Sequence, residues 1–405
     1  MDYRPLFSQA ASRMKYSPIR KMAKISQEPG VISFAAGAPS ADTFPVEAIR
    51  RVTDHIFEND AQAALQYGLT LGYSGLIEVV VEVSRRRQIQ SVSAGQVAIT
   101  SGSQQALDLV GQLFVDPGDV VLVELPTYIG ALAAFRKHQA ELVGVRQDSN
   151  GMDLEHLQTT IRDLTRSGRR LKLIYVIPNF QNPSGITLSL EKRKALVHLA
   201  SRHNLLIIED DPYGELYFDQ SVASQLLPLK AFDQEGVVLY LSTFSKILSP
   251  GLRTGWMIAP ESIIEQIDIV KQAADLCGSM LDQRIVAECW RSGVIERHLP
   301  QIREFYRRRC QVMLSSLEAS MPQVVHWKVP AGGLFLWLTL PDFLDSEKLL
   351  RVAFDEQKVT FVAGAPFFVN GEGHNTLRLA FSKENEDNIR AGILKLANVF
   401  KAHLE

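Results

Sequence analysis

The chain has 405 residues, of which 46% are hydrophobic and 22% are charged, a balance typical of a globular protein with room for two domains. Its formal net charge of −2 offers no electrostatic basis for nucleic acid or an anionic membrane as the main partner. No apolar stretch approaches the length of a membrane-spanning helix, and the N-terminus lacks the apolar core of a signal peptide. We therefore expect neither a nucleic-acid nor a membrane partner.

Cysteine and histidine usage favours a reducing compartment and no metal site. The cysteines at positions 277, 289 and 310 are an odd number without CxxC spacing, which argues against a disulfide framework. The nine histidines show no HExxH or other metal-ligand spacing. We expect a cytoplasmic protein that binds no metal.

From about residue 95 to 260, short apolar runs alternate with amphipathic stretches, which predicts a mostly parallel sheet flanked by helices. Apolar residues have helical spacing over 105–115 and 190–202. In open sheets of this kind, ligands bind in loops at the carboxyl ends of the strands. The predicted strands are 97–100, 120–124, 171–177, 205–209, 237–241 and 255–259.

The segment Ser101-Gly102-Ser103-Gln104 lies between a predicted strand and a predicted helix. Backbone N–H groups at a helix N-terminus point outward at the positive end of the helix dipole, so this turn could hold a phosphate. Serine and glycine also cap many helices, and by itself the turn leaves both interpretations open.

Two further polar segments follow predicted strands. The first, residues 178–185, contains Asn182 before a proline and by itself is an ordinary Asn-Pro turn. The second contains Asp210 between Glu209 and Asp211. A carboxylate there could keep a pyridine nitrogen protonated, or it could cap a helix or lie in a solvated turn. Three consecutive carboxylates leave the choice among them open.

Lys246 ends the segment Ser242-Thr243-Phe244-Ser245-Lys246, directly after a predicted buried strand, and Gly251-Leu252-Arg253 follows. A lone lysine is normally a solvated surface charge. A lysine at a buried strand end can instead form a Schiff base, while nearby hydroxyls and an arginine hold a phosphate. This combination is what pyridoxal phosphate requires.

After Pro260 the sequence predicts longer charged helices over 261–274 and 281–320, the second interrupted at Pro300. Strand-like segments follow at 332–337 and 377–381. We predict an N-terminal segment, 1–44, that joins the small domain, a large cofactor-binding domain, 45–295, and a small C-terminal domain, 296–405.

These motifs resemble the class I/II aminotransferases of fold type I, which depend on pyridoxal 5′-phosphate, from Ser17-Pro18-Ile19-Arg20 to Arg378. Segments 32–40 and 65–68 look most like the subgroup of 2-aminoadipate and kynurenine aminotransferases. The resemblance implies an α/β fold with a mostly parallel sheet in the large domain, a smaller α/β domain, and a homodimer with shared active sites. One departure is Ala36, where the subgroup often has a second glycine beside the one matched by Gly37.

The resemblance also implies a role for each site residue. Lys246 binds the cofactor and acts as general acid and base, and Asp210 pairs with the pyridine nitrogen. Tyr128 stacks on the ring, while Asn182 and Tyr213 serve its phenolic oxygen. The phosphate is held by Ser103, Gln104, Thr243, Ser245, Arg253 and the partner subunit's Tyr67, and the substrate is held by Gly37, Asn182, Arg378 and Arg20. In the subgroup an arginine matched by Arg20 turns toward an acidic substrate side chain or swings away to admit an apolar one.

We therefore expect an aminotransferase that moves an amino group between an L-amino acid and a 2-oxo acid, with 2-oxoglutarate as acceptor, by a ping-pong mechanism. A β-lyase or decarboxylase with the same cofactor is the alternative, because a carbanion can partition differently with small changes around the ring. A third alternative is the ligand-sensing domain of a transcription regulator. It is the least expected, because no basic DNA-binding segment precedes Ser17.

Overall fold

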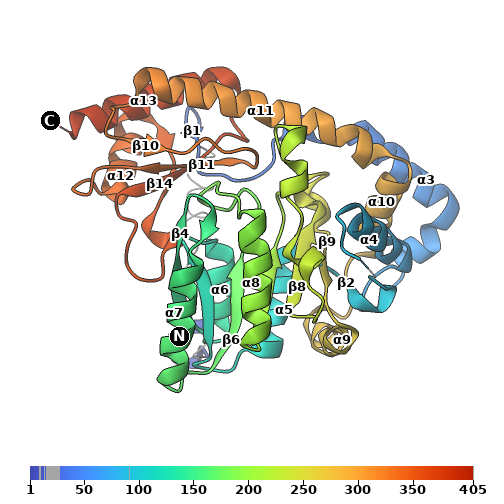
Figure 1. Ribbon diagram of the computed structural model, residues 1–405. Coiled ribbons are helices and arrows are strands. Elements are labelled where there is room, and N and C mark those ends of the chain that lie inside the picture. The colour runs from blue at the N-terminus through green and yellow to red at the C-terminus, as the bar shows by residue number, and fades with distance from the viewer. Residues whose placement is uncertain (9–10, 13, 15–27, 91, 405) are drawn as a thin grey trace.

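The computed structural model describes residues 1–8, 11–12, 14, 28–90 and 92–404. Its centre is an eight-stranded sheet with the strand order β2-β9-β8-β7-β6-β3-β4-β5 (Figure 1). Five neighbouring strands, β8 to β4 in this order, are parallel, whereas β9 is antiparallel to both of its neighbours and β5 is antiparallel to β4. The predicted α/β fold with a mostly parallel sheet is confirmed. The strands are β2 (Val97–Thr100), β3 (Val120–Leu125), β4 (Glu141–Asp148), β5 (Gly151–Met152), β6 (Leu171–Val176), β7 (Leu206–Asp210), β8 (Val238–Thr243) and β9 (Gly255–Ile258).

Helices cover both faces of this sheet. In Figure 1, α7 (Leu154–Arg166) and α8 (Leu190–Arg202) lie in front of it, and α5 (Ser103–Phe114) and α6 (Ile129–Lys137) lie behind it. Successive side chains of a strand point to opposite faces. Along β3, Val120 and Leu122 therefore pack with α7 and α8, while Val121 and Val123 join the apolar core on the α5 and α6 side. All of β3 is buried, as expected for a strand covered on both faces.

The helices that follow the sheet differ from the prediction in one respect. The interruption predicted at Pro300 is wrong, because Pro300 lies inside α11 (Val294–Ser320) and the chain breaks at Gly293 instead. Gly293 has a φ of +71°, a conformation that glycine adopts without strain and that ends a helix. Pro300 removes one helical hydrogen bond, which the buried packing of Ile302 and Tyr306 in the same helix offsets. The other helices here are α9 (Glu261–Asp275) and α10 (Met280–Arg291), and α10 packs on α3 (Val46–Leu65) and α4 (Ser74–Arg86).

The C-terminal part of the chain forms a smaller antiparallel sheet with the order β10-β11-β14-β13. Near the N-terminus, β1 (Ile32–Ser33) pairs in parallel with β12 (Val359–Thr360). We propose that residues 28–44 and 296–405 form a small domain and 45–295 a large one, with α11 running across both (Figure 1). The N-terminus lies away from the smaller sheet, on the side of the large domain, so the predicted joining of 1–44 to the small domain does not extend to residues 1–8 (Figure 1). The remaining elements are β10 (His326–Trp327), β11 (Phe335–Thr339), α12 (Ser346–Gln357), β13 (Val362–Ala363), β14 (Thr376–Ala380) and α13 (Glu386–Ala402).

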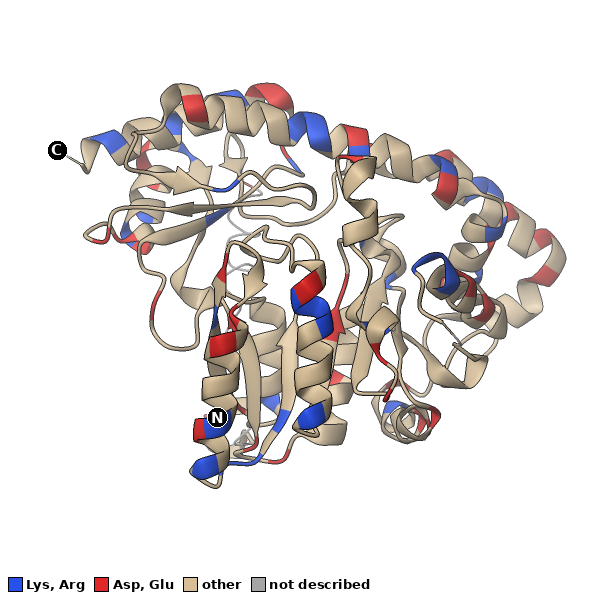
Figure 2. Ribbon diagram, viewed as in Figure 1, with Lys and Arg blue, Asp and Glu red and all other residues tan. Residues whose placement is uncertain are grey.

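Charged residues of both signs are interspersed along the surface helices, most visibly along α11 (Figure 2). Among the helices of the described residues, none is both long and apolar enough to cross a membrane. The described part of the chain also contains no cluster of three His, Cys, Asp or Glu side chains that could hold a metal ion.

Candidate active site

Most of the predicted site residues lie at the carboxyl ends of the central parallel strands. Asp210 is the last residue of β7, Thr243 is the last residue of β8, and Lys246 ends the short 3-10 helix η6 (Phe244–Lys246) that follows β8. Because parallel strands end at one edge of a sheet, these side chains meet. They surround a cavity of about 150 Å³. The predicted residues brought together around it are Ser103, Gln104, Tyr128, Asn182, Asp210, Tyr213, Thr243, Ser245, Lys246 and Arg253.

The other predicted residues lie beside this cavity, away from it, or outside the described residues. The carbonyl oxygen of Gly37 accepts a hydrogen bond of 3.3 Å from Lys246 Nζ. A Cβ atom at Gly37 would lie 2.5 Å from the ring of Phe335, so a larger residue there would require the buried Phe335 ring to shift. Tyr67 does not line the cavity, and 78% of its surface is exposed. Arg20 lies outside the described residues.

One end of the cavity suits a phosphate. Gly102 precedes α5 with a φ of +76°, and a Cβ atom there would lie 2.6 Å from Arg253 Nη2. Arg253 donates to the carbonyl oxygens of Ser101, at 3.0 Å, and Pro250, at 3.2 Å. Its Nη1 is 3.4 Å from the hydroxyl of Ser245. A helix N-terminus, a hydroxyl and a guanidinium thus converge, and each of these groups stabilises an anion.

The amine of Lys246 is partly buried and lies 5.8 Å from the centroid of the Tyr213 ring. Burial lowers the pKa of Lys246 to about 8, with the positive charges of Arg378 and Arg253 acting in the same direction. A larger fraction of this amine is therefore neutral near physiological pH than for an exposed lysine. The neutral form is the nucleophile that attacks a carbonyl carbon.

Asp210 is buried and only one of its carboxylate oxygens is hydrogen-bonded. Tyr175 Oη donates to Oδ2 at 2.8 Å, while Oδ1 has no partner among the described residues. Burial raises the pKa of Asp210 to about 7, and the charge of Asp211 adds to the rise; the hydrogen bond from Tyr175 and the charge of Lys246 oppose it. A buried acceptor without a donor is costly. A protonated pyridine nitrogen would supply that donor, so the residues present fit pyridoxal phosphate.

Tyr213, Asn182 and Tyr128 also line the cavity. Burial raises the pKa of Tyr213, so its hydroxyl stays protonated and able to donate. Its ring packs edge-on against Phe335, with 5.7 Å between the centroids. Tyr128 directly precedes α6, and its hydroxyl lies 3.4 Å from Gln104 Oε1.

Arg378 on β14 is almost fully buried next to the cavity. It donates to the carbonyl oxygen of Ala35 at 2.6 Å and to Asn182 Oδ1 at 2.8 Å. Its guanidinium lies 4.4 Å from the centroid of Phe335 and 5.4 Å from that of Phe367. Within the described residues no ion pair of Arg378 with a carboxylate is found, and its Nε has no acceptor. Burial lowers its pKa to about 10, so the group is still cationic and suited to an incoming carboxylate.

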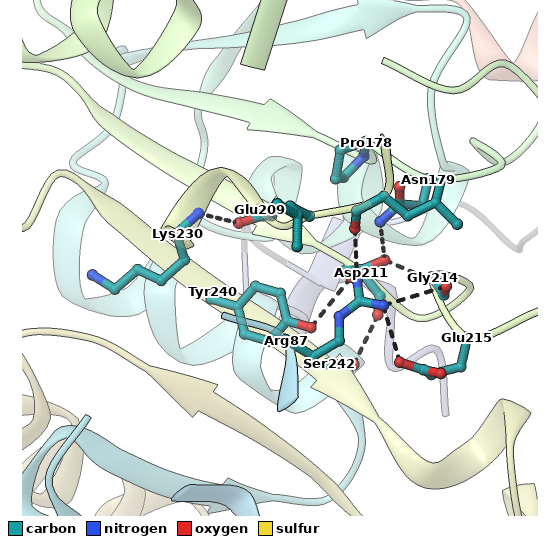
Figure 3. A network of polar contacts seen from close by, with 12 residues as sticks. Arg87, Pro178, Asn179, Glu209, Asp211, Gly214, Glu215, Lys230, Tyr240 and Ser242 are labelled. Carbon is teal, nitrogen blue, oxygen red and sulfur yellow. Dashed lines mark hydrogen bonds and ion pairs between the residues drawn. The ribbon is translucent and has the colours of Figure 1, made fainter. Parts of the chain in front are cut away.

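The structure also separates the roles of the three consecutive carboxylates. Glu209 accepts from the backbone of residues 229 and 230, at 2.7 and 2.9 Å. Asp211 is at the centre of the polar network in Figure 3. Asp210 alone lines the cavity. The donors to the Asp211 side chain are Asn179 (2.8 Å), Gly214 (3.1 Å), Arg87 (2.8 Å) and Tyr240 (3.2 Å), and Ser242 donates to its carbonyl oxygen (2.7 Å).

Several residues at the site were missed by sequence reasoning. Phe335 and Phe367 enclose Arg378, but aromatic residues in apolar segments give no signal that distinguishes them from ordinary core. Tyr175 contacts Asp210 from near the carboxyl end of the apolar strand β6. A tyrosine in a strand covered on both faces needs a buried hydrogen-bond partner for its hydroxyl. The position of Tyr175 in such a strand is therefore a sequence signal for a buried polar contact.

The family described as aminotransferase class I and II matches residues 29–396. The chain is 42% identical over 405 residues to "Aromatic-amino-acid aminotransferase 1" of Thermococcus litoralis, covering 100% of this chain and 96% of that protein. The structure of Pyrococcus horikoshii kynurenine aminotransferase in complex with PMP, KYN and KYA matches with a TM-score of 0.95 and 41% identity over 100% of this chain and 99% of that one. The structure of α-aminoadipate aminotransferase from Thermus thermophilus, complexed with N-(5′-phosphopyridoxyl)-L-leucine, matches with a TM-score of 0.91 and 37% identity, also over 100% and 99%.

Proposed function

Because this chain belongs to the class I and II aminotransferase family, we propose how its own residues carry out the transfer of an amino group. The protein is a fold type I aminotransferase that depends on pyridoxal 5′-phosphate. When bound, the cofactor supplies a carbonyl carbon that takes up the amino group and an electron-withdrawing ring that stabilises a carbanion at the substrate Cα. The observation that supports the residue roles best is that the Lys246 amine and the buried Asp210 carboxylate border one small cavity.

In this proposal the amine of Lys246 would hold the cofactor and, once freed, would act as the general acid and base that moves the proton at the substrate Cα. Asp210 accepts a hydrogen bond from the pyridine nitrogen and keeps it protonated. Asn182 and Tyr213 donate to the phenolic oxygen, and Tyr128 stacks on the ring. The phosphate is bound by Ser103, Gln104, Thr243, Ser245, Arg253 and the partner subunit's Tyr67.

The substrate α-carboxylate binds Arg378 close to Gly37 and Asn182. The unpaired cation of Arg378 supports this assignment, because a buried guanidinium is stabilised by a carboxylate that binds bidentately. The exposed Tyr67 supports a homodimer with shared active sites, since an aromatic side chain left in solvent by one subunit is available to another. The three cysteines are free, which supports a cytoplasmic location.

The experiment that tests the function is a panel of amino donors against 2-oxoglutarate, the acceptor that we propose. In double-reciprocal plots of initial rate against the concentration of one substrate, we expect parallel lines at several fixed concentrations of the other substrate. This pattern is expected because both half-reactions use one site. Turnover of an amino acid that does not depend on any 2-oxo acid would contradict the proposal and indicate a lyase or decarboxylase.

We predict that the enzyme accepts both dicarboxylic and bulky apolar or aromatic amino acids. The relatives are named for aromatic, kynurenine and α-aminoadipate substrates, and one was crystallised with a phosphopyridoxyl-leucine. Arg20 is proposed to bind the second carboxylate. Arg20→Ala should then weaken kcat/KM for 2-aminoadipate and glutamate by about 1.5 to 3 kcal/mol, the scale of one charged hydrogen bond, and leave aromatic donors nearly unchanged. A uniform loss across both classes, or no loss, would contradict this role.

Capture of the cofactor by the cofactor-free enzyme should become faster as the pH rises from 6 to about 9. The pKa of Lys246 is lowered to about 8, so the fraction of neutral, nucleophilic amine rises through this range and then levels off. The measurement is the rate of the absorbance change on mixing with pyridoxal phosphate at each pH. A rate that continues to rise up to pH 10.5 would indicate a lysine with its ordinary pKa.

A further inference from the structure

Two buried tyrosines flank β7 and donate to consecutive aspartates at its end. Tyr175 lies on β6 and its hydroxyl is 2.8 Å from Asp210 Oδ2. Tyr240 lies on β8, on the other side of β7, and its hydroxyl is 3.2 Å from Asp211 Oδ2. The two tyrosines are therefore alike in burial, in strand environment and in type of partner. They differ in that only Asp210 borders the cofactor cavity.

The two aspartates depend on their tyrosines to very different degrees. The hydroxyl of Tyr175 is the one hydrogen-bond donor to the Asp210 side chain among the described residues. The Asp211 side chain has three further donors, from Asn179, Gly214 and Arg87 (Figure 3). Loss of the Tyr175 hydroxyl would leave the Asp210 side chain without any donor from the protein, whereas loss of the Tyr240 hydroxyl would leave Asp211 well held.

We propose that Tyr175 is a positioning residue for the transamination site: its hydroxyl holds Oδ2 of Asp210, so that Oδ1 is presented to the protonated pyridine nitrogen of the cofactor. This inference rests on the proposed role of Asp210. The Tyr175 ring itself packs edge-on against Phe135, with 5.9 Å between the centroids, and Tyr175→Phe would keep that packing. The substitution therefore removes the hydroxyl with little change in shape.

The groups that shift the pKa of Asp210 support the same role for Tyr175. The charged groups that act on Asp210 are Asp211, which raises its pKa, and Lys246, which lowers it; burial has the largest effect and raises the pKa to about 7. The hydrogen bond from Tyr175 stabilises the carboxylate against these effects. Without it, the carboxyl shifts toward its neutral form, which no longer keeps the pyridine nitrogen protonated.

The test compares Tyr175→Phe with the matched control Tyr240→Phe in the full-length enzyme. Three quantities are measured: the affinity of cofactor-free protein for pyridoxal phosphate, kcat with a good amino donor, and the pH dependence of the absorbance of the bound cofactor. For Tyr175→Phe we expect the affinity and kcat each to fall about tenfold, and the pH midpoint of the absorbance to move, as for loss of one hydrogen bond to a charged group. For Tyr240→Phe we expect the affinity for pyridoxal phosphate and kcat to stay within about twofold of wild type, even if thermal stability falls.

Further variants separate the inference from its premise. If Asp210→Asn leaves the affinity for pyridoxal phosphate and the absorbance profile unchanged, the proposed role of Asp210 fails, and the inference fails with it. If Asp210→Asn weakens binding but Tyr175→Phe does not, or if Tyr240→Phe has the same effect as Tyr175→Phe, only the positioning role of Tyr175 is overturned. In the Asp210→Asn background, adding Tyr175→Phe should cause no further loss of affinity.

Should Tyr175→Phe fail to fold, 3-fluorotyrosine introduced at position 175 keeps the size of the ring and makes the hydroxyl a stronger donor. We then expect the pH midpoint of the cofactor absorbance to move in the direction opposite to that expected for loss of the hydroxyl. An unchanged midpoint would overturn the proposal.

Discussion

Replacing Lys246 by alanine is expected to lower turnover by about four orders of magnitude or more, while the protein remains folded. The variant loses both the covalent attachment of the cofactor and the group that moves the proton, and general acid and base catalysis alone contributes about a hundred- to ten-thousandfold. The fold should tolerate the change, because the one hydrogen bond that Lys246 Nζ makes among the described residues is long, 3.3 Å to the carbonyl oxygen of Gly37, and burial already disfavours its charge.

The measurement combines steady-state kinetics with borohydride reduction and peptide mapping. In the wild-type enzyme, reduction should attach the cofactor permanently to Lys246 and abolish the visible absorbance of the bound cofactor. Lys246→Arg is the matched variant, because it keeps a cation in the cavity but removes the nucleophilic amine. Near-normal turnover in Lys246→Arg would show that Lys246 acts only through its charge. Attachment of the cofactor to another lysine would show that Lys246 is not the attachment site.

The part of the site that could be predicted from the sequence is the part made by the ends of parallel strands. Asp210 and Lys246 lie within a few residues after apolar runs, 205–208 and 237–241, and neighbouring parallel strands bring such positions to one edge whatever the details of packing. Arg378 lies far along the chain, in the antiparallel sheet, and only the resemblance to a family indicated it. Its contact with Asn182 depends on how the smaller sheet packs, which no local pattern encodes.

Other features depend on register and on packing around turns. The contact between Tyr175 and Asp210 requires a particular alignment of β6 with β7, and a continuous apolar strand carries no alternation from which that alignment could be read. β4 was not predicted, because most of its residues are partly or fully exposed and its one buried residue is Val145. The sequence predicts the helix break at Pro300 because proline is in general the stronger helix breaker. The left-handed conformation of Gly293, by contrast, depends on how the flanking helices pack in the folded protein.

Asp210→Ala is expected to lower kcat by about a hundredfold or more, the scale of removing one electrostatic support from a reaction centre. Asp211→Ala is not a suitable control for Asp210→Ala, because the Asp211 carboxylate accepts four hydrogen bonds. Its removal would also leave Arg87 without one of its buried partners. Breaking such a pair costs about 3 to 5 kcal/mol in folding stability. Asp211→Asn, which retains one of the two acceptor oxygens, is therefore the better control, and we expect it to affect stability more than kcat per folded enzyme.

The corresponding amide, Asp210→Asn, should have opposite effects on the cofactor-free and the cofactor-bound enzyme. The folded-state pKa of Asp210 is raised from 3.8 to about 7, so its contribution to stability is fully present below about pH 4 and is lost as the pH rises through 7. An amide does not ionise, and Glu124 and Glu209, whose pKa values are also raised, are present in both proteins and cancel in the comparison.

Without cofactor, Asp210→Asn should therefore become more stable than wild type as the pH rises from 4 to 8, with the difference levelling off above pH 8. Saturating pyridoxal phosphate should reverse the order, because a ligand stabilises the protein that binds it more tightly, and only the carboxylate holds the pyridine nitrogen protonated. Denaturant unfolding of both proteins at several pH values, with and without cofactor, measures both differences. If the two proteins have the same stability at pH 8 without cofactor, ionised Asp210 does not strain the fold. If the order is unchanged with cofactor, Asp210 does not bind it.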